Sequence, residues 1–227
     1  MFHTTLSSLR VYTKGHYYTR YNESSLYHVG MTFLFKDVFI FLNSMSVNLV
    51  DIDNGKYIVS IIADDEYIGP NIAMGHEWDG WMRNDIKTYY KEGTDILDVG
   101  ANIGYNTLMF SDYGPVSSFE PVFHQIVAKN VKQNPIRHPV NVYTCALSNE
   151  KKQMEIFIPS HGCQSNTQIN YGGTSFHLEG DMKGMGMQVP CERLDDIYEG
   201  IPSVIKIDVE HHEMQVLEGA KETIQKH

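Results

Sequence analysis

The stretch Asp98-Val-Gly-Ala-Asn-Ile-Gly104 follows a short apolar run and leads into a segment with helical periodicity. Residues 96–99 have the β-branched, apolar character of a buried parallel strand. Gly100 and Gly104 allow a sharp turn, and a side chain at either position would hold a ligand away from the main chain. The backbone amides at the start of the following helix are then available to a polar ligand. The stretch therefore predicts a strand, a turn and a helix that together bind a cofactor.

A second strand signal ends in an acidic residue. Residues 116–119 form another short run, which is followed by Glu120 and Pro121. A carboxylate at the end of the second strand of a β–α–β unit is placed to accept hydrogen bonds from ribose hydroxyls. Pro121 stops the strand because it has no N–H for the ladder. We predict that Glu120 binds the ribose of a nucleotide cofactor and is not a simple surface glutamate.

The details of the turn distinguish two classes of cofactor. Dinucleotide enzymes prefer G-x-G-x-x-G with a pyrophosphate on the helix N-terminus, whereas Asn102 replaces the middle glycine here. The strand also ends in Asp98, whose negative charge would repel a pyrophosphate and suit a ligand with a positive end. S-adenosyl-L-methionine carries an ammonium and a sulfonium and no phosphate. The residues favour this cofactor over NAD, and an NAD-linked oxidoreductase stays as the alternative.

Composition narrows the class of protein further. The 227 residues suffice for one core, and 18 Lys and Arg against 28 Asp and Glu give a net charge of −10. Without a basic run, neither a nucleic acid nor an anionic membrane surface is an expected partner. No apolar stretch reaches the roughly 18 residues of a membrane span, and no signal peptide is evident. Cys145, Cys163 and Cys191 fit neither a disulfide framework nor a zinc pattern, which indicates reduced, mostly buried thiols and a cytoplasmic location.

The chain divides into three regions. Residues 1–30 are polar and tyrosine-rich, carry no clear period and predict a partly ordered extension. Residues 31–90 predict a small antiparallel β element followed by an amphipathic helix. This region contains strand-like runs at 33–42, 47–52 and 57–62, a tight-turn signal at Asp53-Asn54-Gly55, and a helix over 77–90 with Trp78, Trp81, Met82 and Ile86 on one side.

Residues 91–227 alternate between strand and helix patterns and predict the cofactor-binding domain. The expected elements are a strand at 95–99, a helix at 104–112, a strand at 116–120, a helix at 122–133, a strand at 140–145, a strand at 203–209 and a helix at 214–225. This alternation indicates a mostly parallel, doubly wound sheet with its ligand at the carboxyl ends of the strands. Residues 154–158 and 188–191 predict an antiparallel insertion around a glycine-rich segment, 159–187, which we expect to be mobile and which is either a lid or an irregular excursion.

Six short motifs follow one another along the chain. They are Asp98-Val-Gly-Ala-Asn-Ile-Gly-Tyr-Asn-Thr107, Phe119-Glu-Pro121, Ala146-Leu-Ser148, Arg193-Leu-Asp195, Ile207-Asp-Val-Glu-His-His-Glu213 and Leu217-Glu-Gly-Ala220. In these motifs the chain resembles the FkbM family of S-adenosylmethionine-dependent methyltransferases over residues 95–220. The resemblance implies a Rossmann-like class I methyltransferase fold and methylation of a hydroxyl group, most often on a sugar of a glycan, glycolipid or natural product.

The resemblance also assigns roles to individual residues. Asp98, Gly100, Asn102 and Gly104 would line the methionine portion of the cofactor, Glu120 would hold the ribose, and residues 146–148 would lie beside the adenine. The full set of predicted cofactor-binding residues is Asp98, Gly100, Ala101, Asn102, Gly104, Asn106, Thr107, Glu120, Pro121, Ala146, Leu147 and Ser148.

Methyl transfer to a hydroxyl requires a group that takes the proton, and the segment after residue 207 offers candidates. Asp208, Glu210 and His212 are the predicted catalytic residues, and histidine titrates closest to neutral pH. The structural alternatives are a solvent-facing residue at a helix start for His212 and a helix cap for Asp208. A metal held by this acidic and histidine-rich segment is a weaker alternative, and we predict no metal.

Two departures from the family pattern affect the interpretation. The family usually has glycine where this chain has His211, and histidine adopts positive φ less readily. A complete fold of this type continues with three more strands, whereas this sequence stops at His227. Either the sequence is a fragment, or the open strand is covered by residues 33–62 or by a second copy in a homo-oligomer. An inactive cofactor-binding scaffold subunit is therefore a further alternative to an enzyme that acts on a small-molecule or glycan hydroxyl.

Overall fold

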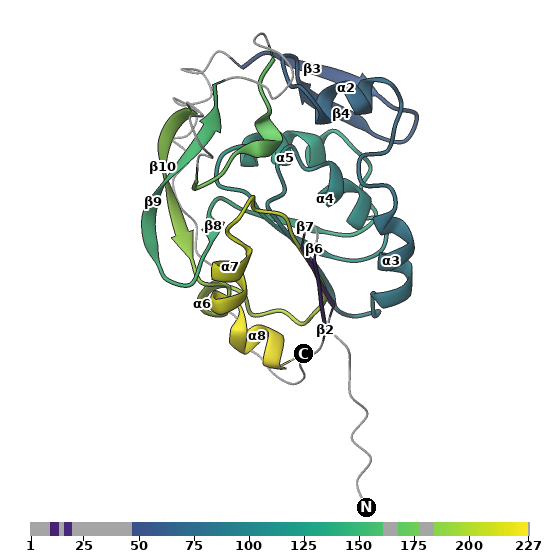
Figure 1. The fold of residues 1–227 in the computed structure, drawn as a ribbon. Coiled ribbons are helices and arrows are strands. Elements are labelled where there is room, and N and C mark those ends of the chain that lie inside the picture. Colours follow the sequence, from purple (N-terminus) through teal and green to yellow (C-terminus); the bar gives the residue numbers. More distant parts are fainter. Residues whose placement is uncertain (1–9, 14–15, 20–46, 161–167, 178–183, 227) are drawn as a thin grey trace, which may run out of the picture.

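The predicted strand at 95–99 lies inside a six-stranded sheet at the centre of the molecule (Figure 1). The computed structural model describes residues 10–13, 16–19, 47–160, 168–177 and 184–226. The sheet has the order β2-β1-β11-β5-β6-β7. Its strands are β1 (Arg10–Thr13), β2 (His16–Thr19), β5 (Asp95–Val99), β6 (Val116–Phe119), β7 (Val140–Tyr143) and β11 (Pro202–Ile207). All neighbouring strands pair in parallel except β2, which confirms the expected α/β architecture with a mostly parallel sheet.

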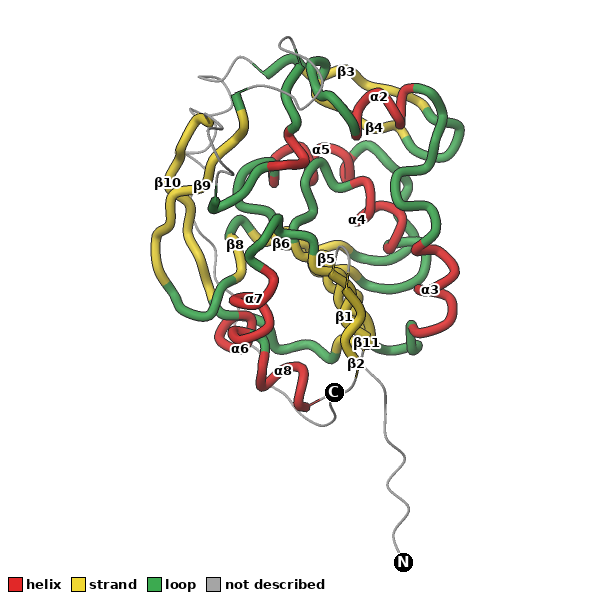
Figure 2. The backbone as a smooth tube through the Cα atoms, viewed as in Figure 1, coloured by secondary structure: helices red, strands yellow, loops and turns green. Residues whose placement is uncertain are grey.

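Both faces of this sheet are covered, which explains why its strands are nearly continuous apolar runs. Ile96 packs with apolar residues of α3 (Met82–Tyr89) and α4 (Tyr105–Phe110). Its neighbour Leu97 packs in a second cluster with residues of α6, α7 and the segment that follows them. The remaining helices are α2 (Ile68–Ala73), α5 (His124–Lys132), α6 (Leu194–Ile197), α7 (Glu213–Gly219) and α8 (Lys221–Lys226). The α6–α8 group lies on the opposite side of the sheet from α3 (Figure 2).

The predicted hairpin before the main domain is confirmed. Strands β3 (Leu49–Asp53) and β4 (Ile58–Ile62) pair antiparallel and form a separate two-stranded sheet. Gly55 adopts φ +84°, and the Asn54 side-chain oxygen accepts hydrogen bonds from the backbone N–H groups of Lys56 and Tyr57. The strand expected at 33–42 lies outside the described residues.

The helix predicted over 77–90 is too long, because regular helix begins only at Met82. Asp79 has φ +51°, a left-handed conformation that interrupts the helix before it. The predicted apolar face is wrong at Trp81, which is 55% exposed, whereas Trp78, Met82 and Ile86 pack in apolar clusters. The C-terminal helix is likewise divided into α7 and α8 at Ala220.

The predicted antiparallel insertion is present and longer than expected. Strands β9 (Lys152–Pro159) and β10 (Gly184–Glu192) pair along their whole lengths, and β10 also pairs with β8 (Ala146–Leu147). Between them, the segment 168–177 contains the short helix η1 (Tyr171–Gly173) and returns to the domain through isolated bridges from Ile169 to Asp65 and from Ser175 to Phe157. The rest of the glycine-rich segment, 161–167 and 178–183, lies outside the described residues.

The open edge of β11 is covered by β1, which lies in the N-terminal region for which no regular element was predicted. β1 pairs in parallel with β11, and β2 pairs with β1. The expectation that residues 33–62 cover this edge is wrong for β3 and β4, because they form their own sheet.

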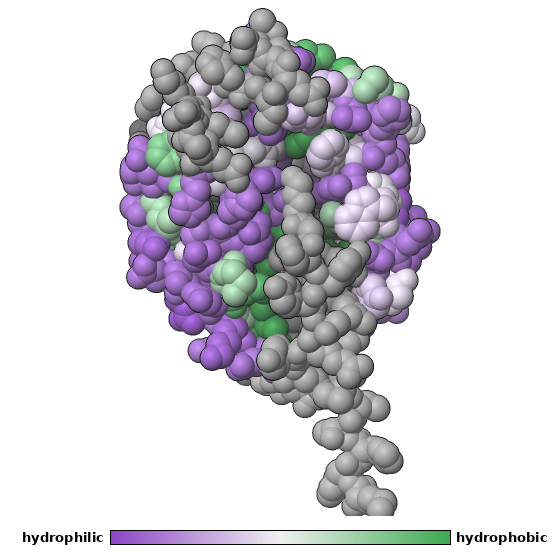
Figure 3. Space-filling model, in the orientation of Figure 1, coloured by the Kyte–Doolittle hydropathy of each residue, from purple (hydrophilic) through white to green (hydrophobic). Residues whose placement is uncertain are grey.

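The face of the molecule in Figure 3 is mostly hydrophilic, with apolar side chains gathered near its middle. Within the described ranges, none of the helices combines the length and apolarity needed to cross a bilayer.

Candidate active site

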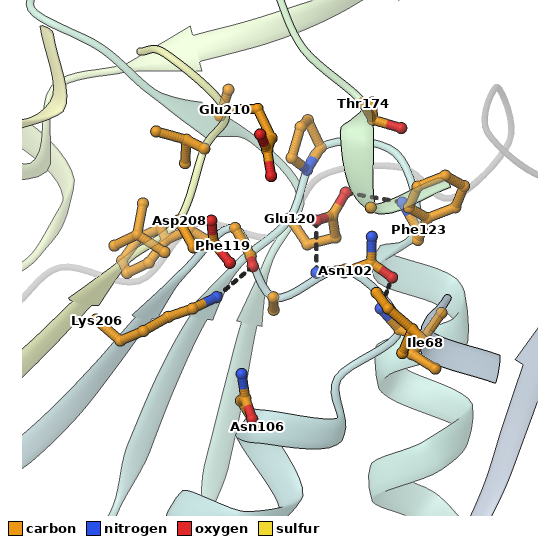
Figure 4. Close-up of a pocket in the computed structure, with 18 of the residues that line it drawn as sticks. Ile68, Asn102, Asn106, Phe119, Glu120, Phe123, Thr174, Lys206, Asp208 and Glu210 are labelled. Atoms are coloured by element: carbon orange, nitrogen blue, oxygen red, sulfur yellow. Dashed lines mark hydrogen bonds between the residues drawn. The ribbon is translucent and has the colours of Figure 1, made fainter. Parts of the chain in front are cut away.

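A cavity of about 390 Å³ opens at the carboxyl ends of β5, β6 and β11 (Figure 4). This is the expected location for a ligand in a parallel sheet, at the point where the strand order reverses. β5 leads to β6 and β7 on one side, while β11 lies on the other. The volume falls in the range typical of small-molecule sites.

The cavity brings together most of the residues that the sequence singled out. The predicted residues that line it are Gly100, Ala101, Asn102, Asn106, Glu120, Pro121, Ala146, Leu147, Asp208 and Glu210. The predicted residues that do not line it are Asp98, Gly104, Thr107, Ser148 and His212. The second group is buried in the protein and supports the walls of the cavity from behind.

The turn after β5 is strongly left-handed. Gly100, Asn102 and Gly104 have φ of +78°, +51° and +83°. A Cβ atom at Gly100 would lie 2.0 Å from the Asp208 carbonyl oxygen, and one at Gly104 would lie 2.9 Å from Val127. Both glycines are therefore required by contacts within the protein, a reason for glycine that adds to the predicted one.

The backbone N–H groups of this turn already have partners. Gly100 and Ala101 donate to the Phe119 carbonyl, and Gly104 donates to the Ala101 carbonyl. Asn102 donates to Glu120 Oε2, and the Ile103 amide donates to the Asn102 side chain. The amides of residues 100–104 therefore all have partners within the protein, and the turn contributes shape to the cavity.

Glu120 lies at the end of β6, lines the cavity and is only 5% exposed. Its Oε1 accepts from the N–H groups of Val122 and Phe123 at 2.7 and 2.9 Å, and its Oε2 accepts from Asn102 at 2.9 Å. Burial raises the pKa of Glu120, against the lowering effect of these backbone donors. Because a carboxylate has about four acceptor positions, the three bonds fix its orientation and leave capacity for a ligand hydroxyl.

Asp98 does not present its charge to the cavity. It is fully buried, its Oδ2 accepts from the Thr107 hydroxyl at 2.6 Å, and its Oδ1 lies 3.1 Å from the Lys206 ammonium. The negative charge that favoured a cationic ligand in the sequence analysis is therefore neutralised within the protein. The carboxylates that do line the cavity are Glu120, Asp208 and Glu210.

Asp208 follows β11 directly, and its backbone N–H extends the ladder by donating to the Val99 carbonyl. Its Oδ1 is shielded from solvent and has no hydrogen-bond partner among the residues that the structure describes. The residue that caps α7 is His212, with no side-chain capping bond, so the helix-cap alternative for Asp208 does not hold. A buried carboxylate oxygen without a hydrogen bond lowers the stability of the fold. A ligand in the cavity that donates a hydrogen bond to this oxygen would remove that cost.

The loop after Asp208 contains two consecutive strained residues. Glu210 and His211 have φ of +46° and +73°, so His211 adopts the conformation for which glycine is suited. The Glu210 carbonyl accepts a hydrogen bond of 2.7 Å from the Ser175 hydroxyl, which ties the loop to segment 168–177. His211, at the position where the family usually has glycine, thus keeps the turn but adopts it with strain.

His212 is buried, so the solvent-facing alternative is wrong. It is 2% exposed, its Nε2 lies 3.0 Å from the Ser148 hydroxyl, and its ring packs 4.6 Å from that of Phe176. Burial lowers the pKa of His212 to about 4. A weakly basic imidazole behind the cavity wall is poorly placed to take a proton from a ligand within the cavity.

Several residues of the cavity wall were not singled out from the sequence. They are Tyr67, Ile68, Trp78, Asn170, Gly172, Thr174, Phe176 and Lys206. Most belong to irregular segments that carry no periodic signal. Lys206 had one signal, since a lysine within an otherwise apolar strand requires a buried partner. In the described parts of the chain, no cluster of three or more His, Cys, Asp or Glu side chains is arranged to hold a metal ion.

The fold and cavity define an α/β protein with a small-molecule site at the carboxyl ends of a parallel sheet. Residues 98–227 match the model of the Methyltransferase FkbM domain, and the chain belongs to this methyltransferase family. The family resemblance seen in the motifs is therefore confirmed. No curated protein matches the chain.

Among solved structures, the chain is similar to the crystal structure of methyltransferase FkbM from Methylobacillus flagellatus KT, with 18% sequence identity and a TM-score of 0.40. The match covers 61% of this chain and 32% of that one, so the chain spans about a third of the length of that protein.

Proposed function

We propose that this protein is an S-adenosylmethionine-dependent O-methyltransferase with a Rossmann-like class I fold that methylates a hydroxyl group of a sugar or glycan. The observation that carries the proposal is the Asp208 carboxylate, which lines the cavity beside the glycine turn with a shielded oxygen that no described part of the chain hydrogen-bonds. The strand order of the sheet and the family of the chain support the same assignment.

The charges on the cavity wall support the choice of cofactor. Glu120, Asp208 and Glu210 contribute carboxylates, and Lys206 is the only Lys or Arg among the described lining residues. Lys206 is itself paired with Asp98, so the wall as a whole favours a cation. This donor set fits the ammonium and sulfonium of S-adenosylmethionine better than the pyrophosphate of NAD. Glu120 would hold the ribose, and the apolar side chains of Phe119, Leu147 and Ile156 would pack against the adenine.

S-adenosylmethionine, when bound, supplies a methyl group on a positively charged sulfur. Asp208 would accept a hydrogen bond from the acceptor hydroxyl and take its proton as the oxygen is methylated. Among the three predicted catalytic residues, Asp208 has the shielded free oxygen, whereas His212 is bonded to Ser148 behind the wall. The apolar side chains of the wall would lower the local polarity, which favours a transition state in which opposite charges disappear.

The nature of the acceptor rests on the family resemblance. Aromatic side chains of Tyr67, Trp78 and Phe176 line the cavity and offer apolar faces against which a sugar ring packs. A nucleic acid is not proposed, given the net charge of −10. The cytoplasmic location remains a prediction, and it agrees with the free, buried thiols of Cys145 and Cys191.

The cofactor is tested by calorimetric titration with S-adenosylhomocysteine and, separately, with NAD. We expect S-adenosylhomocysteine to bind and NAD not to bind. Preferential binding of NAD would support the oxidoreductase alternative instead. Binding of S-adenosylhomocysteine without transfer of labelled methyl to any member of a panel of sugars, glycans and small alcohols would favour the scaffold alternative.

The role of Asp208 is tested with Asp208→Asn, which removes the proton acceptor and keeps the shape of the side chain. We expect methyl transfer to fall by about 10²- to 10⁴-fold while the affinity for S-adenosylhomocysteine stays within about threefold of wild type. Asp196→Asn makes the same chemical change on an exposed side chain that pairs with Arg193, and should leave both quantities unchanged. Full turnover in Asp208→Asn would exclude Asp208 as the base.

A further inference from the structure

We propose that Lys206 is a positioning residue whose ammonium group holds the Gly100 carbonyl and so sets the shape of the cofactor-binding turn. Nothing in the motif pattern assigns this lysine a role, and it lies in the middle of a strand that reads as apolar core. The inference rests on the proposed function only for the identity of the ligand that the turn would bind.

The contact comes from two adjacent strands in register. Lys206 of β11 pairs directly with Asp98 of β5, so both side chains project from the same face of the sheet. The Lys206 Nζ donates to the Gly100 carbonyl at 2.6 Å and lies 3.1 Å from Asp98 Oδ1. The two side chains are 4% and 0% exposed. Figure 4 shows Lys206 reaching across the carboxyl end of the sheet toward the turn.

Asp98 is fixed from its other side. Its Oδ2 accepts the Thr107 hydroxyl of α4 at 2.6 Å, and the same hydroxyl lies 2.6 Å from Ser118 Oγ on β6. Ser118 is in register with Asp98 as well. A polar row therefore crosses three strands beneath α4, and Lys206 forms the end of this row that contacts the turn.

The Gly100 peptide group is held from both sides by this arrangement. In the peptide group that joins Gly100 to Ala101, the carbonyl accepts from Lys206 and the N–H of Ala101 donates to the Phe119 carbonyl. Two residues later, the Asn102 N–H donates to Glu120, the predicted ribose ligand. A change in the orientation of the Gly100 peptide would therefore alter the cavity wall at Ala101 and Asn102 and the support of Glu120.

A contribution to stability does not by itself explain why a lysine is buried at position 206. Burying an ion pair costs desolvation, and well-packed apolar residues of similar volume often stabilise a core as well or better. The flanking residues Ile205 and Ile207 are both 1% exposed, so the strand is otherwise apolar. Burial by itself would lower the pKa of Lys206, but the Asp98 and Asp208 carboxylates raise it above its ordinary value, which keeps the ammonium charged.

The competing explanation is that Lys206 only neutralises Asp98. The two explanations are separated by comparing Lys206→Met, Asp98→Asn and the double variant. Lys206→Met leaves a buried unpaired carboxylate and should lower the melting temperature most. The double variant removes both charges and should recover most of the melting temperature, but it lacks the donor to Gly100. Asp98→Asn keeps that donor and serves as the matched control.

Two readouts accompany the melting temperature. The first is the affinity for S-adenosylhomocysteine, which we expect to fall by at least about tenfold in the double variant and by less than about threefold in Asp98→Asn. The second is amide hydrogen exchange at residues 100–103 in the ligand-free protein. We expect exchange at these positions to be faster in the double variant and unchanged at core amides of β5.

Recovery of both affinity and exchange protection in the double variant would show that Lys206 only neutralises Asp98, and would overturn the proposal. Wild-type affinity in Lys206→Met would overturn it as well. If the wild-type protein does not bind S-adenosylhomocysteine, the proposed function fails. Hydrogen exchange still tests the role of Lys206 in that case, because it requires no ligand.

Discussion

Strained residues gather at the cavity. Asn102, Glu210 and His211 are non-glycine residues with positive φ, and the first two line the cavity wall. Such conformations persist where the surrounding structure enforces them, which is common at functional sites. Here the enforcing contacts are specific: the Asn102 N–H is held by Glu120, and the Glu210 carbonyl is held by Ser175.

The strain at His211 can be measured with His211→Gly and His211→Ala. Both variants remove the exposed imidazole, but only glycine adopts φ of +73° without a steric cost. We expect the glycine variant to be more stable than the alanine variant by about 1 kcal/mol in urea unfolding. Equal stability of the two variants would mean that this backbone conformation stores no strain.

His212 gives the stability of the protein a defined pH dependence. Burial lowers its pKa to about 4, from 6.5 for the free side chain. As the pH falls below about 6.5, the unfolded chain therefore takes up a proton that the folded chain does not, and stability is lost until about pH 4. Above this window the contribution of His212 is complete.

The variant His212→Gln keeps a hydrogen-bonding group near Ser148 and does not titrate. We expect the wild type to lose about 1 to 3 kcal/mol of unfolding free energy relative to this variant between pH 7 and pH 4. The measurement is urea unfolding at a series of pH values. Parallel curves for the two proteins would contradict the buried, neutral state of His212.

At the scale of elements, two asparagines, Asn130 in α5 and Asn134 just after it, join the hairpin to the main domain. Asn130 accepts from the Ser60 N–H at 2.6 Å and donates to the Ser60 carbonyl at 3.1 Å and the Ile103 carbonyl at 2.7 Å. Asn134 makes the same pair of bonds with the backbone of Ile58, at the exposed end of β4. The two side chains thus bond the backbone of β4 in the manner of a neighbouring strand.

These two asparagines form a matched pair for a test of burial. Asn130 is 0% exposed, so Asn130→Ala leaves buried backbone groups without partners, and we expect a loss of about 2 to 4 kcal/mol. In Asn134→Ala, water replaces the lost bonds, and we expect a loss of about 1 kcal/mol or less. Thermal and urea unfolding of both variants give the comparison, and similar losses would contradict the account.

The central elements were predictable because their signals are local. The runs at β5 and β6 and the glycine turn between β5 and α4 lie within about 25 consecutive residues, where strand and helix periods are distinct. The helix over 77–90 was overpredicted, because no apolar pattern reveals that Asp79 adopts a left-handed conformation. β1 and β2 were missed although Arg10-Val-Tyr-Thr13 and His16-Tyr-Tyr-Thr19 flank a Lys-Gly pair, a recognisable hairpin signal.

For the whole molecule, the decisive contact is that of β1 with β11. Parallel pairing from Arg10 to Thr13 covers the edge of a strand whose other neighbour is β5. An uncovered edge presents unpaired N–H and C=O groups to other chains. The same edge was the basis for expecting a homo-oligomer, and here it is paired within the chain.

Removal of residues 1–19 should therefore expose β11. We expect concentration-dependent self-association of this truncated chain in light scattering after size-exclusion chromatography. A truncation that removes only residues 1–9 retains both strands and should behave like the full chain. A stable, monodisperse monomer after removal of residues 1–19 would show that the β1 pairing does not protect the edge.

The sequence by itself determined the order of the elements from β5 to β7, the position of the turn and the family, because each is written in consecutive residues with a characteristic period or spacing. Only the tertiary structure decided which charged side chains face the cavity and which pair with each other within the protein. Asp98 was predicted to meet the ligand, yet the register of β11 on β5 pairs it with Lys206, whose ammonium also holds a carbonyl 106 residues away in the chain. Similarly, burial turns His212, one of the three predicted catalytic residues, into a neutral side chain behind the wall. Register and burial arise from contacts between distant segments, and no local pattern of residues specifies them.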